Sequence, residues 1–135
     1  MRRVLSVTSE CVPLVKTGGL ADVAGALPGA LRPLGWDMRT LLPGYPRVLA
    51  AAKRSKAVAD ISDLFGGDAA VLKAKVAGID LYILDAPHLY DRPGTPYLDD
   101  EGYDYWDNPE RFAALSGVTA DIAENGIDGW TPELV

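Results

Sequence analysis

The sequence predicts a Rossmann-like α/β fold, in which three layers, α/β/α, are built around a largely parallel sheet. Residues 3–8 are apolar and β-branched, which is typical of a buried strand. This segment leads through the pair Gly18-Gly19 into a helical pattern, as in the first unit of an α/β sheet. Strand-like and helix-like segments then continue to alternate along the chain. These observations predict one domain over residues 1–135.

The segment after the glycines predicts a helix that runs to about residue 34. Six apolar residues recur at helical spacing and are expected to form its buried face: Leu20, Val23, Ala24, Leu27, Leu31 and Leu34. Pro28 lacks an amide proton, so it is expected to kink the helix. Pro33 and Gly35 are expected to end it.

Proline and glycine divide the rest of the chain into further elements. Strands are expected at residues 37–42, 56–65, 69–77 and 79–84, with the middle two forming a hairpin. A short helix is expected within residues 45–53, and a longer one from a cap at Asn108, with Pro109 first, to Gly126. Residues 85–107 predict a long loop, which in a compact domain is usually functional or mobile. Residues 130–135 resemble the beginning of another strand, so the chain is expected to be the N-terminal part of something longer.

Composition narrows the function classes. The net charge is −6, which argues against a nucleic-acid-binding surface. No apolar run is long enough to span a bilayer, and the single cysteine, Cys11, allows no internal disulfide, so a cytoplasmic protein is expected. The single histidine excludes a multi-histidine metal site, and no metal is expected. We expect His88 to anchor a loop by a hydrogen bond and Cys11 to be a small buried hydrophobe.

The turn from Lys16 to Gly19 is the clearest candidate for a binding site. A cation followed by glycines where a helix begins suits an anion such as a nucleotide phosphate. The spacing fits neither a P-loop, where the lysine follows the glycines, nor a dinucleotide fingerprint, because the next glycine is Gly25. The residues alone therefore leave a phosphate site and a purely structural turn both open.

Three segments carry a resemblance to a known family. The first runs from Ser9-Glu10 through Lys16-Thr17-Gly18-Gly19-Leu20-Ala21-Asp22-Val23, the second is Leu-Leu-Pro-Gly-Tyr-Pro at 41–46, and the third is Asp-Ala-Pro-His-Leu-Tyr-Asp-Arg-Pro-Gly at 85–94. They closely resemble bacterial glycogen synthase and plant starch synthase. The resemblance covers nearly all of this chain but well under half of a family member.

The resemblance implies a GT-B fold, with two Rossmann-like domains facing each other across a cleft. Residues 1–135 would be part of the N-terminal domain, and the C-terminal domain would be absent. The implied enzyme is a glycosyltransferase that moves glucose from ADP-glucose to the non-reducing end of an α-1,4-glucan such as glycogen, with retention at the anomeric carbon. ADP-glucose would be the donor substrate, and no cofactor is implied.

The resemblance also assigns roles to residues. It places Lys16 and Gly19 at the donor nucleotide and sugar, so we expect the whole turn, including Thr17 and Gly18, to bind substrate. It places Asp22 close to the reaction centre as a candidate catalytic residue and Tyr97 in the acceptor region. The basic residues that clamp the donor diphosphate belong to the family's C-terminal domain. We therefore expect these 135 residues alone to be inactive.

Two other functions are weighed against this one. A non-catalytic nucleotide- or nucleotide-sugar-binding module would use the same turn, whereas a dinucleotide oxidoreductase is disfavoured because its glycine spacing is missing. The aromatic residues of the long loop suit either a glucan surface or anchors that fold the loop: Tyr90, Tyr97, Tyr103, Tyr105 and Trp106. The acidic residues between 99 and 107 are expected to form a solvated face.

Overall fold

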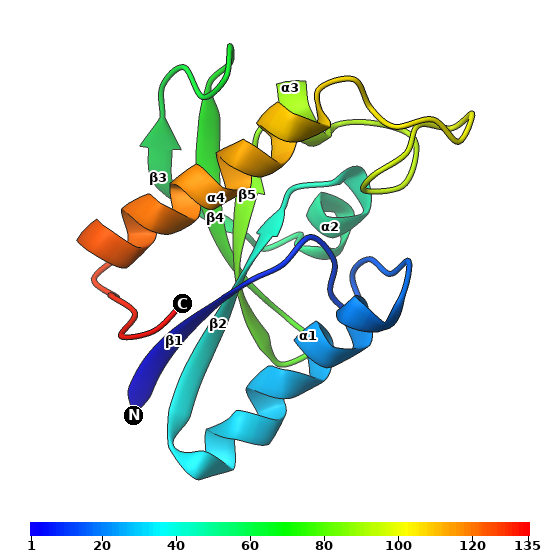
Figure 1. The fold of residues 1–135 in the computed structure, drawn as a ribbon. Coiled ribbons are helices and arrows are strands. Elements are labelled where there is room, and N and C mark those ends of the chain that lie inside the picture. Colours follow the sequence, from blue (N-terminus) through cyan, green and yellow to red (C-terminus); the bar gives the residue numbers. More distant parts are fainter.

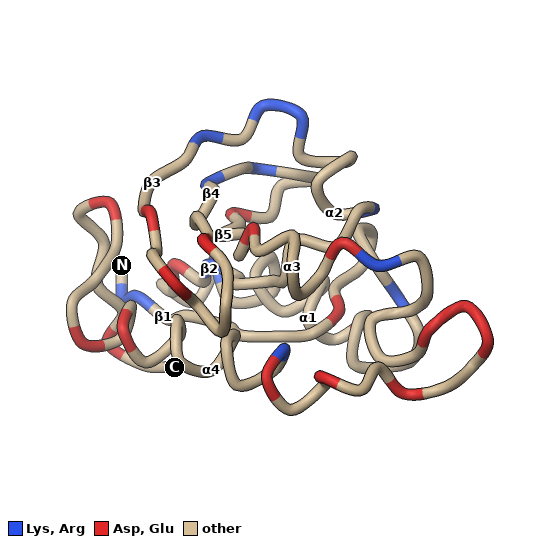
Figure 2. The backbone as a smooth tube through the Cα atoms, turned by 90° about the horizontal axis from the view of Figure 1, so that it is seen from above, with Lys and Arg blue, Asp and Glu red and all other residues tan.

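The computed structural model describes residues 1–135 and shows a five-stranded sheet with helices on both faces (Figure 1). The strand order is β1-β2-β5-β4-β3, with bounds β1 (Arg2–Val7), β2 (Trp36–Pro43), β3 (Lys56–Ile61), β4 (Ala69–Val76) and β5 (Ile79–Asp85). The helices are α1 (Gly19–Leu31), the 3₁₀ turn η1 (Arg32–Leu34), α2 (Pro46–Ala51), α3 (Pro87–Tyr90) and α4 (Asn108–Asn125). The two long helices, α1 and α4, cover opposite faces (Figures 1 and 2). The predicted three-layer α/β/α class is confirmed.

The parallel part of the sheet sets the position of the site. β1 pairs with β2, and β2 pairs with β5, both in parallel, so the carboxyl ends of all three strands lie at one edge. Most residues of β2 and β5 are buried, whereas β1 buries only Leu5, and β2 is followed directly by Gly44 and Tyr45 at that edge. In open α/β sheets ligands bind outside the carboxyl ends of the strands. The turn after β1 lies at this edge.

The antiparallel part is the predicted hairpin of β3 and β4, which continues the sheet beyond β5. The first hairpin strand is shorter than predicted, because it ends at Ile61 rather than at residue 65. Asp63 and Phe65 have positive φ angles of 53° and 49°, which a strand does not accommodate. The turn therefore begins several residues earlier than the glycine pair suggested.

The C-terminal residues, where the sequence predicted the beginning of a strand, lie beside β1. Leu134 forms a parallel bridge with Val4, and the amide of Leu5 donates to the carbonyl of Leu134 at 3.0 Å. The indole of Trp130 donates to the carboxylate of Asp37 at 2.9 Å and holds the approach to this segment. β1 is thus flanked by β2 on one side and by the tail on the other.

The predicted buried face of α1 is mostly wrong, because Ala24 alone among its six residues is buried. The residues that pack inward are Ala21, Ala24 and Pro28, whereas Leu20 and Val23 are 54% and 62% exposed. Small side chains allow the helix to approach the sheet and the preceding loop closely. At Gly25 the approach is closest, because a Cβ there would collide with the carbonyl oxygen of Val12. The leucine spacing describes the outer face of the helix.

Helix α4 buries one apolar stripe that includes Leu115, Val118 and Ile122, and Gly126 ends the helix as predicted, with φ 74°. Its start differs by one residue: Asp107 precedes the first helical residue, Asn108, and Pro109 comes second. The Asn108 side chain is used elsewhere, as described below. The long loop contains one element that the sequence did not predict, the short helix α3. None of the helices combines the length and the apolarity that a membrane crossing requires.

Candidate functional site

The loop between β1 and α1 is fixed by its own backbone. The amides of Cys11 and Val15 donate to each other's carbonyls at 2.9 and 3.0 Å, and the amide of Val12 donates to the carbonyl of Ala21 at 3.0 Å. Cys11 is fully buried in the core, as expected for a small hydrophobe, and burial raises the pKa of its thiol. The loop therefore presents the following residues, 16–19, on a rigid base.

The structure brings two of the predicted site residues together. The ammonium of Lys16 lies 2.9 and 2.8 Å from the two carboxylate oxygens of Asp22, which is in the first turn of α1. Both side chains are about half exposed, at 53% and 54%. An exposed pair of this kind contributes only about 0–1 kcal/mol, so either partner can be drawn away by a ligand. Lys16 and Asp22 thus form a weak ion pair that is accessible to a ligand.

The backbone donors of the turn are divided into two pairs. The amides of Thr17 and Gly18 donate to one carboxylate oxygen of Glu10, at 2.9 and 3.0 Å. The next two amides, of Gly19 and Leu20, begin the helix and have no hydrogen bond to any carbonyl or side chain of the chain. An anion bound at the N-terminus of α1 would therefore meet the amides of Gly19 and Leu20 and not those of Thr17 and Gly18.

Neither glycine of the turn is required by strain or packing. Gly18 has φ −158°, which is extended backbone open to any residue, and no atom lies within 4 Å of a Cβ built at Gly18 or Gly19. What the glycines provide is an uncovered backbone. Gly19 is exposed, so no side chain covers its unbonded amide.

Glu10 is the residue to which sequence reasoning assigned no role. It is 2% exposed and lies below the turn, where its second oxygen accepts from the hydroxyls of Thr17 at 2.6 Å and Tyr97 at 2.5 Å. Burial alone would raise its pKa, but the hydrogen bonds from Thr17, Tyr97 and Gly18 outweigh burial and lower the pKa from 4.5 to about 2. The available signal was its place in the motif, eight residues before the Gly-Gly pair.

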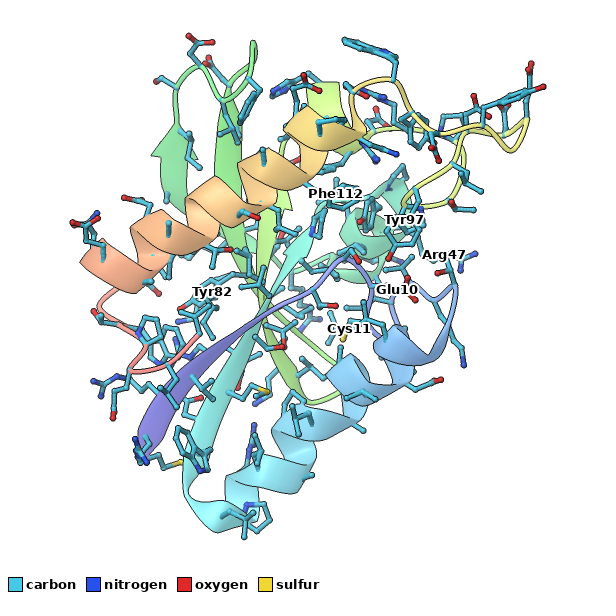
Figure 3. The ribbon with its side chains drawn as sticks, viewed as in Figure 1. Glu10, Cys11, Arg47, Tyr82, Tyr97 and Phe112 are labelled. Atoms are coloured by element: carbon cyan, nitrogen blue, oxygen red, sulfur yellow. The ribbon has the colours of Figure 1, made fainter.

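Tyr97, the predicted acceptor-side residue, is tied to the same carboxylate although it lies in a distant part of the chain. Its hydroxyl donates to Glu10 and lies 2.6 Å from the hydroxyl of Ser9, and its ring packs beside Phe112 at 5.9 Å between centroids. The Asn108 amide donates to the Tyr97 carbonyl at 3.0 Å. Figure 3 shows Tyr97 and Glu10 close together, with Phe112 above them. The structure thus joins three of the predicted residues, Thr17, Gly18 and Tyr97, through Glu10, while Lys16 pairs with Asp22.

The aromatic residues of the long loop divide into anchors and exposed rings. Tyr90 and Tyr105 are buried, and the Tyr90 hydroxyl donates to the carbonyl of Arg111 at 2.6 Å. Tyr103 and Trp106 are 70% and 86% exposed. Tyr90 and Tyr105 are therefore anchors that fold the loop, whereas Tyr103 and Trp106 leave an accessible aromatic surface.

Two arginines fasten this loop to the domain. Arg92 binds the buried carboxylate of Asp107 with both terminal nitrogens, at 3.0 and 2.7 Å, and hydrogen bonding to Arg92 lowers the pKa of Asp107. Asp107 thus departs from the solvated acidic face that was expected of it. Arg111 is fully buried and donates to the carbonyls of Leu89 and Pro96. Fixing Pro96 also fixes its neighbour, Tyr97.

A pocket of about 330 Å³ opens beside the turn. Its walls come from residues 15–17, from Tyr45 to Arg47 at the start of α2, from Tyr90 and residues 92–96, and from Arg111. Figure 3 shows Arg47 on the side of the turn that faces solvent. The pocket is a hollow between the turn that begins at Lys16 and the loop that carries Tyr97.

The remaining chemical candidates have structural roles or none. His88 lies with its Nε2 atom 2.7 Å from the carbonyl of Leu64, so the predicted loop-anchoring hydrogen bond is confirmed. No group of three or more His, Cys, Asp or Glu side chains is arranged to hold a metal ion. The chemistry available to a ligand at the site is that of Lys16, Asp22 and the free amides of Gly19 and Leu20.

A parallel strand-helix-strand unit with an open, polar turn at the carboxyl edge of its sheet defines a Rossmann-like domain. The sequence model of the starch synthase catalytic domain matches residues 3–135. The chain therefore belongs to the starch synthase catalytic domain family.

Relatives with known names agree with this assignment. A glycogen synthase of Paracoccus denitrificans (strain Pd 1222) is 58% identical over 135 residues, and a glycogen synthase 1 of Rhizobium meliloti (strain 1021) is 59% identical over 133 residues. These alignments cover 100% and 98% of this chain but only 29% and 28% of the relatives, so the chain spans less than a third of their length.

A solved structure shares the fold. The catalytic domain of starch synthase IV from Arabidopsis thaliana, bound to ADP and acarbose, superposes with a TM-score of 0.70 at 21% identity. The superposition covers 91% of this chain and 25% of that one. The expected fold class is thereby confirmed.

Proposed function

We propose that this chain forms the N-terminal part of a retaining glucosyltransferase that moves glucose from ADP-glucose to the non-reducing end of an α-1,4-glucan. The family membership and the glycogen synthase relatives support the reaction class. The ADP and acarbose bound to the Arabidopsis enzyme support a nucleotide donor and a glucan acceptor. We also propose that the protein acts in the cytoplasm, without nucleic acid as a partner.

The observation that best supports the proposal is the group of hydrogen-bond donors at the start of α1. Lys16 and the unbonded amides of Gly19 and Leu20 converge where α1 begins, and the positive end of the helix dipole lies there as well. Departure of ADP places negative charge on the diphosphate, and donors fixed in advance lower the barrier to that step. Lys16 can leave Asp22 for the diphosphate at little cost, because their pair is exposed.

Asp22 and Tyr97 complete the proposed site. Once Lys16 turns to the donor, the Asp22 carboxylate is free to bind sugar hydroxyls or to stabilise positive charge that develops on the sugar ring. Tyr97 and the exposed Tyr103 and Trp106 would contact the glucan, since aromatic faces pack on sugar rings. Lys16 is already paired with Asp22, and the family resemblance assigns the cations that clamp the donor diphosphate to the C-terminal domain. We therefore propose that the 135 residues alone do not transfer glucose.

A chimera tests this function. The present chain replaces the matching segment of the Paracoccus denitrificans glycogen synthase, and incorporation of labelled glucose from ADP-glucose into glycogen is measured. We expect the chimera to extend glycogen and the 135-residue chain alone to give none. A folded chimera that binds ADP-glucose without transfer would support the non-catalytic module instead. Transfer by the chain alone would contradict the proposed division of the donor site.

A further inference from the structure

The carboxylate of Glu10 joins two segments that lie far apart in the sequence. One oxygen accepts from the amides of Thr17 and Gly18, and the other accepts from the hydroxyls of Thr17 and Tyr97, all between 2.5 and 3.0 Å. Thr17 and Gly18 belong to the turn on the proposed donor side, and Tyr97 belongs to the proposed acceptor side. No other side chain accepts hydrogen bonds from both segments.

Glu10 is an anion without a cationic partner. The nearest lysine in the turn, Lys16, binds Asp22 instead, and no arginine or lysine forms an ion pair with Glu10. Its charge is compensated only by neutral donors, although the residue is 2% exposed. A buried carboxylate is costly unless its hydrogen bonds are complete, so those donors are held firmly in place around it.

The same bonds exclude a direct chemical role for Glu10. Each oxygen already accepts two hydrogen bonds, and the group is closed off from solvent beneath the turn. A nucleophile or general base needs an accessible lone pair within reach of the substrate. Glu10 offers none, and its influence must pass through the groups that it holds.

We propose that Glu10 is a positioning residue that holds the donor-side turn and Tyr97 at a fixed separation, so that one buried carboxylate sets the geometry of both substrate sides. This inference rests on the proposed function for the meaning of the two sides. By binding the first two amides of the turn, Glu10 also leaves the pair at Gly19 and Leu20 as the donors open to a ligand. Two residues of α4 also hold the segment around Tyr97: Asn108 donates to the carbonyl of Tyr97, and Arg111 donates to the carbonyl of Pro96.

Kinetics of the chimera provide the first test. Glu10→Ala removes all the bonds at once, and we expect it to raise KM for ADP-glucose and KM for glycogen together, each by at least about fivefold. A residue that only stabilised the fold would reduce the active fraction and hence the apparent kcat, with both KM values unchanged. Values of both KM within about twofold of the parent, or a rise in one alone, would overturn the proposal.

Glu10→Gln is the conservative variant and remains useful if the alanine variant fails to fold. Its carbonyl oxygen can still accept from the two amides, and its NH₂ group can donate to the two hydroxyls, which then act as acceptors. We expect both KM values to rise in parallel, by at least about twofold but by less than in the alanine variant. A rise confined to one substrate would contradict a shared positioning role.

Hydrogen exchange on the 135-residue chain gives a readout that needs no enzymatic activity. In Glu10→Gln, and in Glu10→Ala where it folds, we expect faster exchange both in residues 16–20 and in residues 95–99, with β5 unchanged as the internal reference. Faster exchange in only one segment, or in neither, would overturn the proposal. A chimera that transfers no glucose while both segments loosen would instead count against the proposed function alone.

Discussion

Glu10 shows how neutral donors can keep a buried carboxylate ionised. The residue has no cationic partner, yet the hydrogen bonds from Thr17, Tyr97 and Gly18 overcome the effect of burial and lower its pKa to about 2. The negative charge is therefore present throughout the physiological range. It lies beneath the turn, whereas Lys16 lies on the outer side, so the turn presents its cation to solvent and keeps its anion inside.

The depressed pKa makes a prediction for stability against pH. A carboxylate whose pKa is lowered by folding stabilises the native state above its ordinary pKa of 4.5 and loses that contribution as pH falls towards 2. The contribution of Glu10 at neutral pH is up to about 3 kcal/mol. We expect Glu10→Gln to be less stable than the parent chain at pH 7 and to approach it at pH 3, as measured by urea unfolding. A stability difference that is the same at both pH values would contradict the prediction.

Gly19 makes a second prediction at the scale of one residue. A methyl group there meets no atom of the chain within 4 Å, so Gly19→Ala is expected to leave stability unchanged or to raise it by up to about 1 kcal/mol. In the chimera the same methyl would cover the backbone amide and raise KM for ADP-glucose.

Gly29→Ala is the matched control for Gly19→Ala, because Gly29 lies in the same helix, is exposed and also has open space around it. We expect a similar stability change and an unaltered KM. Equal KM values for the two variants would remove Gly19 from the donor site.

At the scale of elements, α1 shows where sequence patterns succeed and fail. Its position and its start followed from the strand, the glycine pair and the helical spacing. Its orientation did not, because the spacing rule gives leucine more weight than alanine, whereas close packing against the loop at Val12 requires the small face with Ala21, Ala24 and Gly25. Helix α4 had only one apolar stripe, so its buried face was predictable.

The orientation of α1 is testable with adjacent residues. Val23 is 62% exposed and Ala24 is 6% exposed. We expect Val23→Gln to change the free energy of unfolding by no more than about 0.5 kcal/mol, and Ala24→Gln to lower it by at least about 2 kcal/mol, because a polar side chain would be forced into the packed face. Urea unfolding of both variants measures this. A larger loss of stability in Val23→Gln than in Ala24→Gln would contradict this orientation of the helix.

The sequence predicted the exposed residues of the candidate site, but it did not predict the buried contact between Glu10 and Tyr97 beneath them. Lys16, Asp22 and the glycines are close in sequence, so their proximity follows from the turn itself. The contact between Glu10 and Tyr97 spans 87 positions and depends on how the long loop folds back, which the anchors Arg92 and Arg111 decide. No local pattern encodes that fold-back.

At the scale of the whole molecule, positive charge is concentrated away from the turn. Figure 2 shows Lys and Arg gathered around the start of β3 and along β4, while Asp and Glu predominate on the long loop. The chain carries a net charge of −6, and the only lysine in the turn, Lys16, is shared with Asp22. A diphosphate at this edge would meet Lys16 and the two free amides of the turn, beside which Arg47 and Arg92 line the pocket.

The central claim, that the Lys16 turn belongs to the donor site, is tested most directly by KM for ADP-glucose in the Lys16→Ala variant of the chimera. Lys53→Ala is the matched control, since Lys53 is an exposed lysine in the turn that follows α2 and forms no ion pair. We expect Lys16→Ala to raise KM for ADP-glucose at least about tenfold, because a charged hydrogen bond to the diphosphate is lost, with KM for glycogen within about twofold of the parent. KM for ADP-glucose equal to that of the Lys53→Ala control would contradict the claim.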